Sequence, residues 1–100
     1  MARLLIQQKI PFTPHVKFQC FNREGKQFEY TVDFLLRSPQ KFAGISPIVT
    51  ALEVKGRLRK KDILRNDALE YCHRVKCWIV LEPHIEMWER ESLFWNTSDF

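Results

Sequence analysis

Hydrophobic and polar residues alternate along two neighbouring stretches near the start of the chain. Residues 15–21 place valine, phenylalanine and cysteine on one face, and residues 28–34 place aromatic residues and valine on one face. This period of two is typical of strands with one buried side. Residues 22–26 lie between the two stretches and include asparagine and glycine, which favour a tight turn. The pattern predicts an antiparallel hairpin.

A third alternating stretch, 48–55, ends at Gly56 and predicts another strand. Further along, apolar residues recur at helical spacing within 59–74. Residues 76–82 are β-branched and aromatic, and they predict a short strand inside the sheet. The apolar stripe of the predicted helix consists of Leu64, Ala68, Cys72 and Val75.

Prolines divide the rest of the chain. Residues 3–9 precede two prolines and predict the last turns of a helix, whereas residues 37–47 contain two prolines and a glycine and predict a surface loop. A final helix is expected from Pro83, because proline is tolerated in a first turn. The elements together predict an α/β fold, with a mixed central sheet (the hairpin plus further strands) flanked by helices. The final helix would carry Ile85, Trp88 and Trp95.

Composition limits the kind of protein that this can be. The chain has 100 residues, of which 45% are hydrophobic, enough for a single folded domain over residues 1–100. The longest apolar run is 77–81, whereas a membrane span needs ~20 residues, so no membrane partner is expected. A formal net charge of +4 favours an anionic partner. Three cysteines without an export signal suit a reducing compartment, so we expect a cytoplasmic protein with free thiols.

Three charged residues lie inside otherwise apolar strands. Glu53 and Lys55 are two residues apart, so their side chains project from one face about 6.5 Å apart. Asp33 lies near the end of the second hairpin strand. If the two strands pair, both acids and the lysine converge at an edge of the sheet. Charges placed among apolar residues need partners, and a divalent cation suits two carboxylates.

Such a group of side chains is suited to phosphodiester hydrolysis. Two carboxylates can hold Mg²⁺, which lowers the pKa of a bound water. The lysine can orient that water or stabilise the charge that develops on phosphorus. The alternative is a structural Glu53–Lys55 pair on a solvent-facing strand, with Asp33 as an ordinary acid at a strand end.

Two short strings, YTVDFLL at 30–36 and LEVKG at 52–56, resemble the PD-(D/E)xK nuclease superfamily. The likeness covers residues 4–82 and is nearest to phage junction-resolving endonucleases and transposon-end-cutting nucleases. It implies a restriction-endonuclease-like core and a magnesium-dependent DNA endonuclease in which Mn²⁺ can replace Mg²⁺. The resemblance implies Asp33, Glu53 and the Val54 carbonyl as metal ligands, with Asp33, Glu53 and Lys55 as catalytic residues.

The sequence departs from the family pattern at two places. Val32 stands where the family has proline, a change that does not touch the metal. The family often carries a glutamate on its first helix, but residues 1–14 contain no acid, only the neutral oxygens of Gln7 and Gln8. Either the domain is cut from a longer chain, or two carboxylates suffice, or the site is inactive. The alternative function is therefore a catalytically inactive nucleic-acid-binding or assembly module on the same scaffold.

A run of basic residues follows this candidate site directly. The backbone of a nucleic acid bound at the metal would pass there, so we expect the run to contact DNA phosphates. The alternative is a solvated helix face. The run consists of Arg57, Arg59, Lys60, Lys61 and Arg65.

Two other groups of residues have structural interpretations. Cys72, His73, Cys77 and His84 lack the paired spacing of a zinc finger, so zinc is disfavoured. The aromatic residues of the carboxy-terminal quarter favour core packing, with a docking surface for a second copy or another protein as the alternative. A small protein-interaction domain is thus a third candidate function. These aromatic residues are Trp78, Trp88, Phe94, Trp95 and Phe100.

Overall fold

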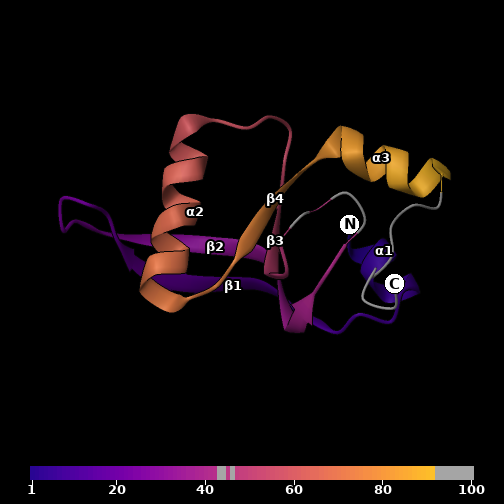
Figure 1. Cartoon of the computed structure of the whole chain (residues 1–100), viewed down its shortest axis with the longest axis horizontal. Coiled ribbons are helices and arrows are strands. Elements are labelled where there is room, and N and C mark those ends of the chain that lie inside the picture. Colours follow the sequence, from indigo (N-terminus) through magenta and orange to yellow (C-terminus); the bar gives the residue numbers. More distant parts are fainter. Residues whose placement is uncertain (43–44, 46, 92–100) are drawn as a thin grey trace.

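The computed structural model describes residues 1–42, 45 and 47–91. Within them the chain forms an α/β fold with one mixed four-stranded sheet and three helices (Figure 1). The α/β class, the mixed sheet with its hairpin and the order of the elements were predicted correctly from the sequence. The elements are α1 Ala2–Gln7, β1 Phe12–Phe21, β2 Gln27–Gln40, β3 Val49–Lys55, α2 Lys60–His73, β4 Cys77–Leu81 and α3 Glu82–Glu91.

The strands lie in the order β1-β2-β3-β4. β2 pairs antiparallel with both β1 and β3, whereas β4 pairs parallel with β3 and needs the crossover helix α2. The predicted hairpin is confirmed. The Asn22 side chain accepts hydrogen bonds from the backbone N–H groups of Glu24 and Lys26, each at 2.9 Å. Gly25 has a φ of 80°, the conformation for which glycine is suited.

Two hydrophobic clusters lie on opposite faces of the sheet. Ala51 belongs to one cluster and Leu52 to the other, because successive residues of a strand point to opposite faces. α2 contributes Leu69 to the first cluster, whereas α1 contributes two leucines to the second and α3 packs Ile85 against it. In Figure 1, α2 crosses β1 and β2, whereas α1 and α3 lie toward the other end of the molecule.

Both hairpin strands are longer than predicted. β1 begins at Phe12 and includes Pro14, and β2 continues to Gln40, so the first four residues of the predicted loop 37–47 are strand. Pro14 is tolerated because β1 is an edge strand, where a missing N–H costs little. Pro39 lies in the stretch where the pairing of β2 with β3 shifts, so it interrupts no regular ladder.

β2 changes face along its length. Tyr30 and Val32 pack in the cluster under α2, whereas Leu36 belongs to the opposite cluster. These three residues would share one face of a regular strand, so the change occurs between Val32 and Leu36, where Asp33 lies. In β1, His15 lies between the residues that pair with Phe34 and Val32 of β2. His15 has a φ of 53°.

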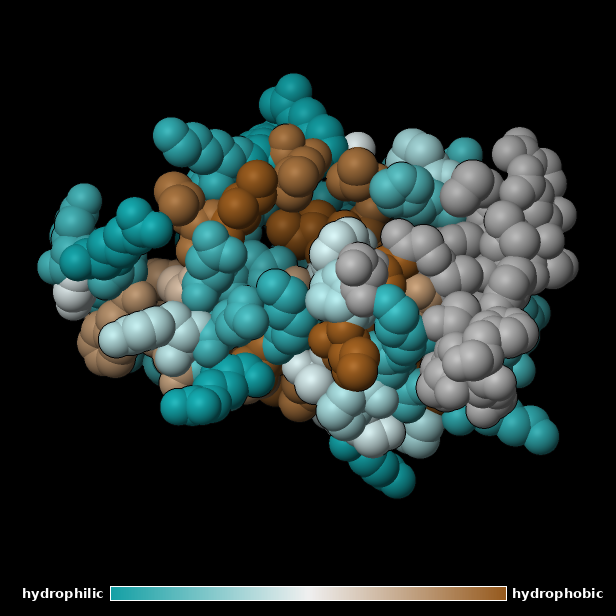
Figure 2. Space-filling view, in the orientation of Figure 1, coloured by the Kyte–Doolittle hydropathy of each residue, from teal (hydrophilic) through white to brown (hydrophobic). Residues whose placement is uncertain are grey.

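The face that α2 presents to the sheet matches the predicted stripe only in part, because Cys72 and Val75 pack against the cluster that contains Leu69. Leu64, from the predicted stripe, is 49% exposed, whereas Asp62 and Leu69 are buried. Asp62 and Leu69 are seven residues apart, which places them two turns apart on one face. The buried side of the helix therefore includes Asp62, a charged residue outside the predicted stripe. Figure 2 shows brown hydrophobic side chains around the upper, amino-terminal end of α2.

α3 begins where the sequence predicts, with Pro83 in its first turn. Trp78 of β4 packs against the cluster beside α1, as core packing requires. None of the helices in the described part of the chain combines the length and the hydropathy needed to cross a bilayer. The aromatic docking surface stays a prediction, because three of its residues lie outside the described part: Phe94, Trp95 and Phe100.

Candidate functional site

The pairing of β2 with β3 brings the two strand acids together. The regular ladder reaches the pair Phe34 and Leu52. Asp33 and Glu53 are the residues that come next to this pair on the two strands. There the carboxylate of Asp33 accepts a hydrogen bond through Oδ2 from the backbone N–H of Val54, at 2.7 Å. Asp33 is thus anchored to the strand that carries Glu53, and its Oδ1 is the oxygen left for a further ligand.

Glu53 is held through both of its carboxylate oxygens. The hydroxyl of Tyr30 donates a hydrogen bond to Oε2, and the ammonium of Lys55 lies 3.4 Å from Oε1. The side chain of Glu53 is only 13% exposed. Since Tyr30 belongs to β2 and Lys55 to β3, the position of the Glu53 carboxylate depends on the pairing of these two strands.

Lys55 contacts a second acid, which the sequence did not single out. Its Nζ lies 3.8 Å from Oδ1 of Asp62, in the first turn of α2. The other oxygen of Asp62 accepts the backbone N–H of Arg59 at 3.1 Å, where the helix begins. The Asp62 side chain is 6% exposed, so its charge is stabilised mainly by these two donors. The lysine ammonium lies between an acid of the sheet and an acid of the helix.

Two groups behind Glu53 are held in their protonated forms. Burial raises the pKa of the Cys77 thiol to about 12, and the charge of Glu53 and, more weakly, that of Asp33 add to this rise. Burial also raises the pKa of Tyr30, with further contributions from Cys77 and Glu53. Tyr30 is therefore a neutral hydrogen-bond donor toward Glu53.

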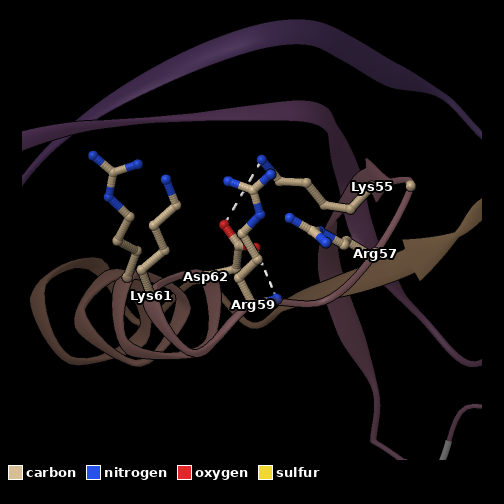
Figure 3. A pocket seen from close by; sticks show the side chains of 7 residues that line it. Lys55, Arg57, Arg59, Lys61 and Asp62 are labelled. Carbon is tan, nitrogen blue, oxygen red and sulfur yellow. Dashed lines mark hydrogen bonds and ion pairs between the residues drawn. The ribbon is translucent and has the colours of Figure 1, made fainter.

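A basic pocket of about 480 Å³ opens beside Lys55. Figure 3 shows Lys55 and Arg57, from the end of β3 and the loop after it, pointing toward Arg59 and Asp62 at the start of α2. Five cationic side chains and one carboxylate line the pocket. Among the described residues, Lys55 is the only one of these five cations that has an ion-pair partner. The lining residues are Lys55, Gly56, Arg57, Arg59, Lys61, Asp62 and Arg65.

The structure brings four of the five predicted phosphate-binding residues to this pocket and sets one apart. Lys60 is exposed at the first position of α2 and is not among the residues that line the pocket. Arg65 is directed by an aromatic contact, with its guanidinium 5.6 Å from the ring centre of Phe28. Hence the cations are arranged by the sheet and by α2 together, and not by their order in the sequence alone.

The residues considered for zinc have other contacts. Nε2 of His73 lies 2.6 Å from the backbone carbonyl of Gln19, and Sγ of Cys72 accepts the backbone N–H of Phe21 at 3.4 Å. Cys77 instead lies 4.0 Å from the Tyr30 hydroxyl. Across the described residues, no group of three or more His, Cys, Asp and Glu side chains is arranged to hold a metal ion.

Comparisons with known proteins add no assignment. The chain matches no family model, no curated protein and no solved structure.

Proposed function

We propose that the chain is a magnesium-dependent DNA endonuclease that hydrolyses phosphodiester bonds through a PD-(D/E)xK-type site. The observation that carries the proposal is the contact between Asp33 and the backbone beside Glu53, with Lys55 paired to Glu53. Two acids from adjacent strands and a lysine thus share one place, as the resemblance requires. The order of helix, three strands, helix and strand supports a restriction-endonuclease-like core.

The donor set fits a hard divalent cation that retains water. Asp33 and Glu53 would supply carboxylate oxygens and Val54 its carbonyl, and Mg²⁺ commonly binds through one or two carboxylates with waters completing its shell. The absence of a three-acid group among the described side chains is compatible with such a site. When bound, the ion would polarise the phosphate and lower the pKa of an attacking water.

The protein's own residues have separate parts in the proposed reaction. Lys55, whose side chain is 37% exposed, can reach a substrate and stabilise negative charge on the phosphate oxygens. Asp33 and Glu53 orient the cation. Phosphates next to the cleaved bond would lie in the basic pocket, where the cations hold the backbone of DNA at a fixed distance from Lys55. The phosphate-binding residues of the pocket are Arg57, Arg59, Lys61 and Arg65.

Cleavage assays with conservative variants test the proposal. Glu53→Gln and Asp33→Asn should abolish cleavage of plasmid and branched DNA in Mg²⁺ or Mn²⁺, because each replaces a charged ligand by a neutral one. The matched control is Glu29→Gln, an exposed acid of the same strand β2, which should cut like the parent. Thermal unfolding should show that all three variants fold. The proposal fails if the parent does not cut DNA, or if Glu53→Gln cuts equally well.

The second candidate is a nucleic-acid-binding or assembly module without catalysis. It is favoured by the absence of an acid in residues 1–14 and by a basic pocket that does not depend on a metal. Direct measurement of Mn²⁺ binding by calorimetry separates the two functions. A nuclease should take up the ion through Asp33 and Glu53, whereas the module should bind DNA with the same affinity in metal and in chelator.

A further inference from the structure

Tyr30 occupies an unusual place for a buried aromatic residue. It is 5% exposed and packs in the cluster under α2. Its hydroxyl nevertheless points to a charged group, since it donates a hydrogen bond to Oε2 of Glu53. It does not line the basic pocket, so it would not touch a substrate bound there.

The two oxygens of the Glu53 carboxylate have different partners. Oε2 faces the buried hydroxyl of Tyr30, and Oε1 faces the ammonium of Lys55. A glutamate side chain has several rotatable bonds, and ordering it costs conformational entropy. A buried partner on the neighbouring strand removes that cost before a ligand arrives. Groups that hold metal ligands in this manner commonly change metal affinity when they are removed.

We propose that Tyr30 is a positioning residue of the site, whose hydroxyl holds Oε2 of Glu53 and so presents the carboxylate to a divalent cation. This inference rests on the proposed function and adds a residue that acts through Glu53. A purely structural Tyr30 would only fill volume in the core. The two interpretations differ in what the hydroxyl alone contributes.

Tyr30→Phe removes the hydroxyl and keeps the ring. We expect the dissociation constant for Mn²⁺, measured by calorimetry on the whole chain, to rise about 10- to 100-fold, as for other residues that hold a metal ligand. The Mg²⁺ concentration for half-maximal cleavage should rise in parallel, while the rate at saturating Mg²⁺ stays near that of the parent. The matched control is Tyr71→Phe, which removes the hydroxyl of a side chain that is 88% exposed on α2.

A second control separates positioning from general loosening of the core. Cys77→Ala removes a buried neighbour of Tyr30 and leaves the hydroxyl in place. We expect it to bind Mn²⁺ like the parent even where its melting temperature falls as far as that of Tyr30→Phe. Equal losses of affinity in these two variants would overturn the proposal.

The outcomes also separate this inference from the proposed function. If Glu53→Gln abolishes Mn²⁺ binding and Tyr30→Phe binds like the parent, Tyr30 has no positioning role and the nuclease proposal stands. If the parent binds no Mn²⁺ and cuts no DNA, both proposals fall. If the dissociation constant for Mn²⁺ rises in Tyr30→Phe but not in Cys77→Ala, both proposals are supported.

Discussion

Asp62 shows how a single buried acid can organise the proposed reaction. Its carboxylate joins the start of α2, through the backbone N–H of Arg59, to the ammonium of Lys55 on β3. A buried carboxylate that accepts contacts from two donors is held in one position, whereas a lysine side chain on its own is long and flexible. Asp62 therefore restricts the positions that the Lys55 ammonium can occupy, without competing for a cation.

Asp62→Asn tests that restriction. The amide oxygen can still accept the N–H of Arg59, but the charge that attracts Lys55 is lost. We expect the cleavage rate at saturating Mg²⁺ to fall about 10- to 100-fold, as for a misplaced catalytic group. Asp62→Ala also loses the helix cap and should cost about 1 kcal/mol of unfolding free energy beyond the Asn variant. The control is Asp67→Asn, which changes an exposed acid of the same helix. If Asp62→Asn cleaves DNA at the same rate as Asp67→Asn, the role of Asp62 is contradicted.

Sequence alone predicts Asp33, Glu53 and Lys55 as a group, because strand periodicity and short motifs are local features. Tyr30 and Asp62 were missed for a physical reason. The partner of Tyr30 is 23 residues away and depends on the pairing of β2 with β3. Asp62 depends on the rotation of α2. One signal was available: Asp62 lies three residues after Arg59, the position from which an acid caps a helix.

At the scale of elements, α2 both covers the sheet and forms one wall of the basic pocket. Lys61 and Arg65 are four residues apart and therefore lie on one side of the helix. Arg65 also packs on the ring of Phe28, which limits its motion. Lys60 carries the same charge at the neighbouring position but does not line the pocket. The helix thus offers an internal comparison between a cation inside the pocket and one outside it.

Salt dependence of DNA binding makes this comparison quantitative. Each phosphate contact that is lost lowers the slope of log affinity against log salt by roughly 0.9. We expect the double variant Lys61→Gln, Arg65→Gln to lower the slope by about 1.8 and Lys60→Gln to leave it near that of the parent. Fluorescence anisotropy with a duplex in chelator measures binding without cleavage. If Lys60→Gln lowers the slope by as much as each charge removed in the double variant, the pocket is not the phosphate site.

The strands and helices themselves were predicted better than their ends and faces. Alternation and turn residues predict the hairpin, and its Asn22 and Gly25 behave as such residues usually do. The strand ends were wrong where Pro14 and Pro39 were taken as breaks, because an edge strand and an irregular pairing both tolerate proline. The buried face of α2 was predicted only in part: Cys72 and Val75 pack against the cluster under the helix, whereas Leu64 is exposed and Asp62 is buried.

At the scale of the whole molecule, charge is unevenly distributed. The chain has a formal net charge of +4, and the pocket alone combines five cations with one carboxylate. This local excess of positive charge would attract a polyanion to the pocket beside Lys55. The sheet beside this pocket has a separate hydrophobic cluster on each of its two faces.

Buried protonated groups in one of these clusters predict how stability depends on alkaline pH. The pKa of the Cys77 thiol is about 12 in the folded chain against an ordinary value of 9.0. Above pH 9 the unfolded chain releases this proton while the folded chain keeps it, so unfolding becomes easier as pH rises. Each such proton contributes up to about 1.4 kcal/mol per pH unit. Tyr30 acts in the same direction at higher pH, because its pKa is also raised.

Urea denaturation of the parent and of Cys77→Ala, from pH 7 to pH 10.5, measures this contribution. The variant should be less stable than the parent by a constant amount up to about pH 8, because burial of a side chain is lost and no proton is exchanged by this thiol. Above pH 9 the two curves should converge, since only the parent loses stability through Cys77. Parallel curves throughout would show that the thiol is as acidic in the folded chain as in the unfolded one. In that case Cys77 would not be sealed from water between Tyr30 and the acids of the sheet.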